Sequence, residues 1–228
     1  MKIWQKEGVS RCFSPRFLFV DIATTPHRNQ ILPDTRDKWR NRLPHWEVAD
    51  RPHFITIRCA GTLPLKARAK IAEIHASLRT IDPVSSQFAI LQRQYFLTSE
   101  KFLDDASGFQ PFVSKAVCET VLTTWADMKN QHGWSVPHHV IMPNHVHFII
   151  EPGSKPIQTL RKTLHHFKGQ TARNANLILG RRGPFWQAEW FDRWLCNETE
   201  STRIIEYIHN NPIKAGFVTR CSDYPWVR

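Results

Sequence analysis

Two histidines that stand two positions apart are the residues best suited to chemistry. They are His145 and His147, in the β-rich segment MPNHVHFII that spans residues 142–150. Side chains alternate between the faces of a strand, so both imidazoles project from one face, roughly 7 Å apart at the backbone. Such a pair on a rigid strand can bind a divalent metal ion. The chain holds 12 histidines, however, so the pair alone also fits ordinary surface or core histidines, and catalysis needs a chemical partner.

Tyr207 and Asn211 supply that partner. They stand four positions apart in a helical segment and therefore project from one helix face, about one turn apart. A phenol with a pKa near ~10 is a weak nucleophile at neutral pH, and a neighbouring divalent cation polarises a scissile phosphate and holds the geometry of attack. Mixed nitrogen and oxygen ligands suit Mg²⁺ or Mn²⁺, while zinc could also bind the imidazoles. The alternative is that Tyr207 packs at the sheet edge and Asn211 caps the helix before Pro212.

Hydrophobic periodicity elsewhere predicts the elements that must position these residues. Strands are expected at 53–60, 134–142, 145–151 and 189–195. Helices are expected at 66–79, 111–130, 156–179 and 199–210, the last ended by Pro212. The segment 88–97 is ambiguous. This order predicts an α+β fold, a ferredoxin-like split βαβ sandwich with an antiparallel sheet and helices on its faces.

Composition and charge restrict the domain organisation and the partner. Residues 1–40 are expected to be a poorly ordered leader, and residues 41–228 a single domain. The net charge is +11, with a pI near 9.8, which favours a polyanion, either nucleic acid or an anionic membrane surface. No apolar run approaches the ~18 residues that span a bilayer, and no signal peptide is recognisable. A cytoplasmic protein is therefore expected. The five scattered cysteines do not suggest a disulfide framework or a zinc ribbon.

A basic ridge is predicted next to the metal site, on the helix at 156–179 and just after it. Its members, with His165, are Arg161, Lys162, Lys168, Arg173, Arg181 and Arg182. These side chains could neutralise phosphates, and Trp186, Trp190 and Trp194 could stack unpaired bases. The alternative is an ordinary solvated helix face beside tryptophans of the core.

Several separated motifs, in this order, resemble the REP-associated tyrosine transposases of the HUH single-tyrosine transposase superfamily. They are MPNHVHFIIEP, FKGQTARNANLILGRRGPFWQ, FDRW and EYIHNNPIKAGFV…DYPW, and residues 42–64 look like the start of the same domain. The resemblance covers roughly residues 40–228. It implies a ferredoxin-like domain in which His145 and His147 bind the metal, Tyr207 is the nucleophile and Asn211 is the third metal ligand.

The activity that this resemblance implies is the cleavage and rejoining of single-stranded DNA. The family forms a 5′-phosphotyrosine and releases a 3′-hydroxyl that later attacks to rejoin strands, typically at hairpins of repetitive extragenic palindromes. Single-stranded or hairpin DNA is thus the expected partner, and a membrane is not. Three alternatives remain: an HUH nickase of the replication-initiator type, a non-catalytic protein that binds palindromic hairpins, and a zinc hydrolase. The hydrolase would use His138 and His139 with the histidine pair, but no carboxylate lies at metalloprotease spacing.

Overall fold

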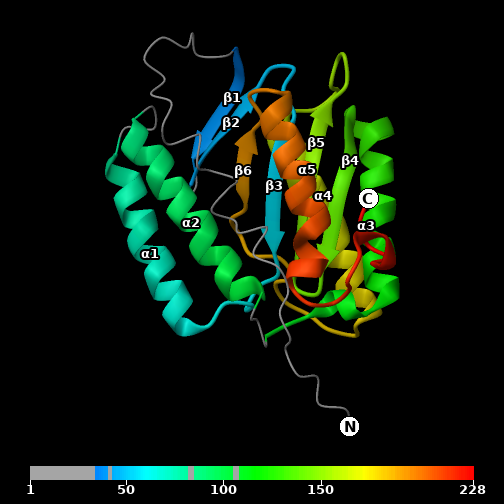
Figure 1. Cartoon of the computed structure of the whole chain (residues 1–228). Helices are drawn as coiled ribbons and strands as arrows, with labels where there is room; N and C mark the ends of the chain where they lie inside the picture. Colours follow the sequence, from blue (N-terminus) through cyan, green and yellow to red (C-terminus); the bar gives the residue numbers. More distant parts are fainter. Residues whose placement is uncertain (1–33, 41–42, 82–84, 105–107) are drawn as a thin grey trace.

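The computed structural model describes residues 34–40, 43–81, 85–104 and 108–228 (Figure 1). Of the leader expected at 1–40, only residues 34–40 lie within these ranges. Strand β1 (Thr35–Arg40) pairs antiparallel with β2 (Pro44–Val48). The expected boundary after residue 40 therefore falls inside a β-hairpin, and the rest of the leader lies outside the described residues. Within these ranges, no helix has the length and apolar character that crossing a membrane requires.

The centre of the molecule is a four-stranded antiparallel sheet in the order β4-β5-β3-β6. Its strands are β3 (His53–Arg58), β4 (Trp134–Met142), β5 (His145–Pro152) and β6 (Phe191–Trp194). Of these four strands, β3 comes first in the sequence but lies between β5 and β6, so that Thr56 pairs with His147. This order, with helices in the crossovers, is the split βαβ arrangement. The predicted α+β sandwich is therefore confirmed.

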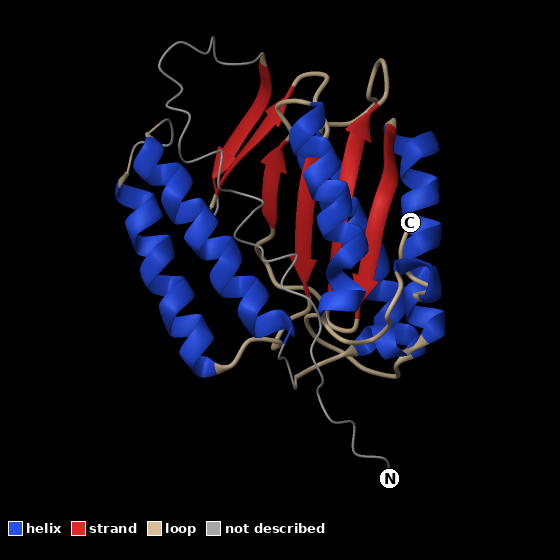
Figure 2. Ribbon diagram, in the orientation of Figure 1, coloured by secondary structure: helices blue, strands red, loops and turns tan. Residues whose placement is uncertain are grey.

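Helices cover both faces of this sheet (Figures 1 and 2). They are α1 (Leu65–Thr80), α2 (Ser86–Asp104), α3 (Lys115–His132), α4 (Leu160–Ile178) and α5 (Glu198–Lys214), with short 3₁₀ turns at Pro111–Val113 and Cys221–Asp223. Helices α3 and α4 pack on the face that carries Ile57 and Phe148. Helices α1, α2 and α5 pack on the face that carries Phe54 and Ile149. We call these two surfaces the scaffold face and the site face.

Helix α5 does not end before Pro212, as the sequence suggested, but continues to Lys214. Proline has no N–H and so cannot bond to the preceding turn, yet the helical pattern resumes directly after it. The N–H of Ala215 donates to the carbonyl of Asn211 at 2.9 Å, and the N–H of Phe217 donates to that of Pro212 at 2.9 Å. As a consequence, Asn211 lies inside the helix, one turn beyond Tyr207.

A buried ionic cluster attaches the β1–β2 hairpin to β6. The Nε2 of His45 lies 2.9 Å from Oε1 of Glu189, and its Nδ1 contacts Asp192. Burial by itself lowers the pKa of His45, but the charges and hydrogen bonds of Asp192 and Glu189 outweigh it and raise the pKa to about 9. The His45 ring also stacks on Trp39, with centroids 5.1 Å apart. A charged imidazole thus joins the hairpin to the edge of the sheet.

Candidate active site

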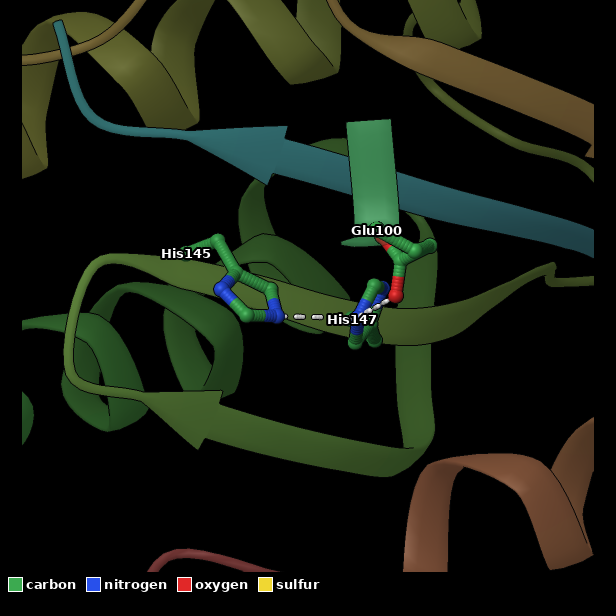
Figure 3. A group of neighbouring side chains, drawn as sticks. All are labelled: Glu100, His145 and His147. Atoms are coloured by element: carbon green, nitrogen blue, oxygen red, sulfur yellow. Dashed lines mark hydrogen bonds and ion pairs between the residues drawn. The ribbon is translucent and has the colours of Figure 1, made fainter. Parts of the chain in front are cut away.

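His145 and His147 lie on the site face of β5, buried between the sheet and the helices. Their Nε2 atoms are 3.0 Å apart, and their rings meet edge to face with centroids at 4.6 Å. Figure 3 shows the two rings converging from one strand. The alternation of side chains along β5 therefore brings the predicted pair together.

Neighbouring polar side chains orient both imidazoles. The Oδ1 of Asn144 lies 2.5 Å from Nδ1 of His145, and the Oγ1 of Thr56 lies 2.8 Å from Nδ1 of His147. Asn144 is itself held, because its Nδ2 donates to the carbonyl of Leu103 at 3.1 Å. Metal-binding histidines commonly have the second ring nitrogen fixed in this way. Each ring therefore presents Nε2 to the same point.

Glu100, on α2, is a third member of the site that the sequence reasoning missed. Its Oε2 lies 3.3 Å from Nε2 of His147 and accepts a hydrogen bond from the Tyr207 hydroxyl. One ligand atom from each of Glu100, His145 and His147 lies within 4.8 Å of the others (Figure 3). Glu100 is 1% exposed. The structure thus adds a buried carboxylate to the histidine pair.

Interactions within the site shift the pKa values of Glu100 and His145. Burial by itself raises the pKa of Glu100, but the charge of His147 and the hydrogen bond to it, helped by His145 and Tyr207, lower the pKa to about 2. Burial and, next, the charge of His147 lower the pKa of His145 to about 3. Metal binding requires a deprotonated carboxylate and neutral imidazoles. Glu100 and His145 are therefore in the forms that bind a metal.

Tyr207 lies on the buried side of α5, with its hydroxyl directed at Glu100. Its ring packs edge-on against Phe54, at 6.1 Å between centroids, and against Phe96 at 5.8 Å. The His147 ring lies 5.4 Å away. The predicted nucleophile and the histidine pair are therefore neighbours, joined by one carboxylate oxygen.

Asn211 is also buried on this side of α5. Its Nδ2 donates to the carbonyl of Tyr207 at 2.9 Å, while its Oδ1 has no hydrogen-bond partner within the described part of the chain. A buried acceptor without a partner is costly. Two imidazole nitrogens, a carboxylate and this amide oxygen make a donor set that fits a divalent cation.

The predicted basic ridge is not next to this site. It lies on α4 and the loop that follows, and α4 packs on the scaffold face, across the sheet from the histidines. The predicted position was wrong because the apolar stripe of a helix does not indicate which face of the sheet the helix covers. Lys162, Arg173 and Arg182 are exposed there.

Three other members of the ridge have local partners. Lys168 donates from Nζ to the carbonyls of Gln187 at 2.8 Å and Ala188 at 2.6 Å, and burial lowers its pKa to about 8. The Arg181 guanidinium lies over the Phe109 ring and bonds to Asn176 and Pro184, and that of Arg161 lies over the Trp39 ring. The contacts of Lys168 and Arg181 hold the loop against α4, and the contact of Arg161 joins α4 to β1.

Two of the three tryptophans predicted to stack bases are core residues. Trp186 and Trp190 are buried on the scaffold face, and Nε1 of Trp186 donates to Oγ1 of Thr171 at 2.8 Å. The stacking prediction is therefore wrong for both, because neither ring is open to a base. Trp194, on β6, is half-buried.

The four-histidine set of the hydrolase alternative does not converge. His139 packs against Trp125, which lies across the sheet from the pair, with centroids 4.7 Å apart. His138 lies against His209 instead, at 5.8 Å. Among the described residues, the group of three formed by Glu100 and the pair is the cluster with metal-binding geometry.

Comparison with known proteins places part of this chain in a family. Residues 110–211 match the family model of IS200-like transposases. Among solved structures, the chain is similar to a REP-associated tyrosine transposase bound to a REP hairpin, with 14% identity and a TM-score of 0.46 over 84% of this chain and 81% of that one. It is also similar to a Deinococcus radiodurans R1 protein assigned as a transposase, with 15% identity and a TM-score of 0.34 over 76% and 96% of the two chains. A search of curated proteins gave no match.

The two structural likenesses are distant, so the assignment depends on the family match. That match spans both histidines, the tyrosine and the asparagine of the site, and it confirms the predicted relationship to transposases. This match supports a DNA-processing enzyme of the transposase type.

Proposed function

We propose that this protein is a single-tyrosine HUH transposase that cuts and rejoins single-stranded DNA through Tyr207. The observation that carries the proposal is one shared atom. Oε2 of Glu100 accepts the hydrogen bond of the Tyr207 hydroxyl and lies 3.3 Å from Nε2 of His147. A nucleophile and a candidate metal site are thus within one side chain of each other, in a segment that matches a transposase family.

The proposed reaction is an in-line displacement at a backbone phosphorus. The Tyr207 oxygen forms a bond to phosphorus and loses its proton, while the bond from phosphorus to the 3′ oxygen breaks and that oxygen gains a proton. The products are a 5′-phosphotyrosine and a free 3′-hydroxyl. Attack by a 3′-hydroxyl on the phosphotyrosine reverses these steps, so strands are rejoined without an external energy source.

The proposed cofactor is Mg²⁺ or Mn²⁺, with His145, His147 and Asn211 as ligands. When bound, the ion would neutralise the charge that develops on the phosphate. Asn144 and Thr56 keep the imidazoles oriented, and the rings around Tyr207 keep its hydroxyl at the metal site. The protein's contribution is therefore a preorganised set of buried polar groups.

The proposed substrate is single-stranded or hairpin DNA; a REP hairpin is bound to the similar REP-associated tyrosine transposase. The net charge of +11 supports a DNA partner. We propose that Lys162, Arg173 and Arg182, with the other ridge residues, contact phosphates away from the cleaved bond, because α4 lies across the sheet from Tyr207. We further propose that residues 41–228, together with the paired strand β1, act as one domain in the cytoplasm.

The test is covalent capture of labelled DNA. The full chain is incubated with end-labelled hairpin DNA and Mn²⁺ and analysed on a denaturing gel. The wild type and Tyr224→Phe should form a protein–DNA adduct, since the Tyr224 hydroxyl donates to the carbonyl of Ile141 and does not enter the site. Tyr207→Phe and His145→Ala should form none.

Each other outcome identifies an alternative. An adduct that persists in Tyr207→Phe would place the nucleophile elsewhere. Tight hairpin binding without an adduct in the wild type would favour a non-catalytic binding protein. Cleavage without rejoining of a supplied 3′-hydroxyl strand would favour a nickase.

A further inference from the structure

Glu100 lies upstream of the segment that matches the transposase family, on the helical hairpin formed by α1 and α2. Figure 3 shows its carboxylate reaching the histidine pair from a different element. We propose that Glu100 is a ligand of the divalent cation and, through the same carboxylate, the residue that positions the Tyr207 hydroxyl. The α1–α2 hairpin is then part of the active site. This inference rests on the proposed function.

The two oxygens of Glu100 are used unequally. Oε2 contacts both His147 and Tyr207, whereas Oε1 is buried and has no hydrogen-bond partner within the described part of the chain. A buried carboxylate is costly unless it is paired, hydrogen-bonded or bound to a metal. One of its oxygens is therefore free for a cation.

Two other buried glutamates show what a purely structural role looks like in this protein. Glu200 accepts from Nε of Arg193 at 2.7 Å with one oxygen and from the N–H of Cys196 at 2.8 Å with the other. Glu189 likewise lies 2.9 Å from Nε2 of His45 with one oxygen and accepts from the N–H of Leu43 at 3.2 Å with the other. Both satisfy each oxygen with protein donors. Glu100, which lies at the histidine pair, differs because its Oε1 has no such donor within the described part of the chain.

The charge of the site points the same way. The two imidazoles and the amide of Asn211 carry no negative charge, so a divalent cation held by them alone would be buried without a counter-charge. Glu100 supplies one negative charge at the convergence of the two Nε2 atoms. Carboxylate oxygen is also the ligand that Mg²⁺ and Mn²⁺ prefer. The carboxylate therefore completes the donor set in number and in charge.

The link to Tyr207 gives Glu100 its second role. The hydroxyl comes from α5 and its acceptor from α2, so the hydrogen bond fixes the position of the nucleophile between two helices. Glutamine at position 100 would keep an oxygen that accepts this bond but would lose the charge. Alanine would lose both. The two substitutions therefore separate the two roles.

The first test is Mn²⁺ binding to the full chain, measured by isothermal titration calorimetry without DNA. Glu100→Gln should weaken binding by at least roughly 10-fold, since changes beyond the ligands themselves already cost 10–100-fold. Glu200→Gln, which removes a buried carboxylate away from the pair, should leave the affinity unchanged. Wild-type affinity in Glu100→Gln would overturn the ligand role. If Glu100→Gln does not fold, Glu100→Asp replaces it, with weaker binding expected and unchanged binding counting against the role.

The second test is the rate of adduct formation at saturating Mn²⁺. Glu100→Ala should be slower than Glu100→Gln, because only glutamine keeps an acceptor for the Tyr207 hydroxyl; equal rates would overturn the positioning role. Failures of the inference and of the proposed function are distinguishable. A wild type without any adduct, whose Mn²⁺ affinity still depends on Glu100, refutes the function alone. An active wild type with an affinity independent of Glu100 refutes the ligand role alone.

Discussion

The two faces of the central sheet come from the same strands but differ in chemistry. Along β5, His145 and His147 project to the site face, whereas Val146 and Phe148 project to the scaffold face. On β3, Thr56 also projects to the site face, where its Oγ1 contacts His147. Because neighbouring residues of a strand point to opposite faces, the same strands carry a polar buried site on one face and an apolar core on the other.

Within the described part of the chain, the two faces also differ in some of the buried polar atoms that lack a hydrogen-bond partner. Among the residues of the helices on the site face, these atoms include two oxygen acceptors, Oε1 of Glu100 and Oδ1 of Asn211. On the scaffold face they include the indole N–H donors of Trp125 and Trp190. Free acceptors attract a cation, whereas free indole donors do not. Substitutions on the two faces should therefore separate effects on activity from effects on stability.

The largest expected effect on stability comes from Trp190→Ala on the scaffold face. Trp190 is 1% exposed, packs against His45 at 4.9 Å between centroids, and lies under the Nζ of Lys168 at 4.9 Å. Truncating a buried tryptophan should cost about 3–5 kcal/mol of unfolding free energy, measured by urea denaturation. The yield of DNA adduct per folded molecule should stay at the wild-type level, because the ring has no part in the site.

Trp194→Ala is the matched control, since this half-buried ring on β6 should cost less. A fall in adduct yield for Trp190→Ala that exceeds its unfolded fraction would mean that the scaffold face takes part in DNA processing. The division between the two faces would then fail.

A smaller effect should appear as a pH dependence of stability from the His45 cluster. The pKa of His45 is about 9 in the folded chain, against an ordinary value of 6.5. Because the folded pKa is the higher one, the stabilisation is complete below pH 6.5 and is lost as the pH rises through about 9. The loss should approach roughly 3 kcal/mol. Urea denaturation at pH 7 and at pH 9.5 measures it.

The control for this cluster is Asp192→Asn, which removes one of the two carboxylates that raise the pKa of His45. Lys168, whose pKa is lowered to about 8, changes stability with pH in the opposite direction, but its contribution is the same in the wild type and the variant. The stability difference between wild type and variant should therefore shrink from pH 7 to pH 9.5. A difference that is equal at the two pH values would show that His45 is uncharged at pH 7.

Much of the fold could be predicted because its elements have clear hydrophobic periods. The strand at 53–60 and the strand pair at 134–151 agree with β3, β4 and β5 within two residues. Pro212 misled the prediction of the end of α5, because proline removes one bond but does not force a helix to stop when the next turn is packed. The face covered by α4 could not be predicted, since it depends on tertiary packing rather than on a local pattern.

The site was predictable where its residues share one element and hidden where they do not. His145 with His147, and Tyr207 with Asn211, have spacings that a single strand or helix imposes. Glu100 has no such partner in its own helix. Its signal was a charged residue within an apolar stripe, because it follows the buried Phe96 by four positions and precedes the buried Leu103 by three. The ambiguous reading of 88–97 concealed that stripe.

The smallest expected effect concerns the exposed charges of α4, and it tests which face of the sheet DNA follows. If Lys162 and Arg173 each neutralise one phosphate, alanine at either position should reduce the slope of log affinity against log salt by about 1. Fluorescence anisotropy with labelled hairpin DNA at several salt concentrations measures this slope. The adduct rate at saturating DNA should not change, because α4 lies across the sheet from Tyr207.

Lys66→Ala is the matched comparison, since Lys66 is exposed on α1, which packs on the site face. A reduced slope in Lys66→Ala alone would place the DNA along the site face, and the ridge on α4 would then be an ordinary solvated surface.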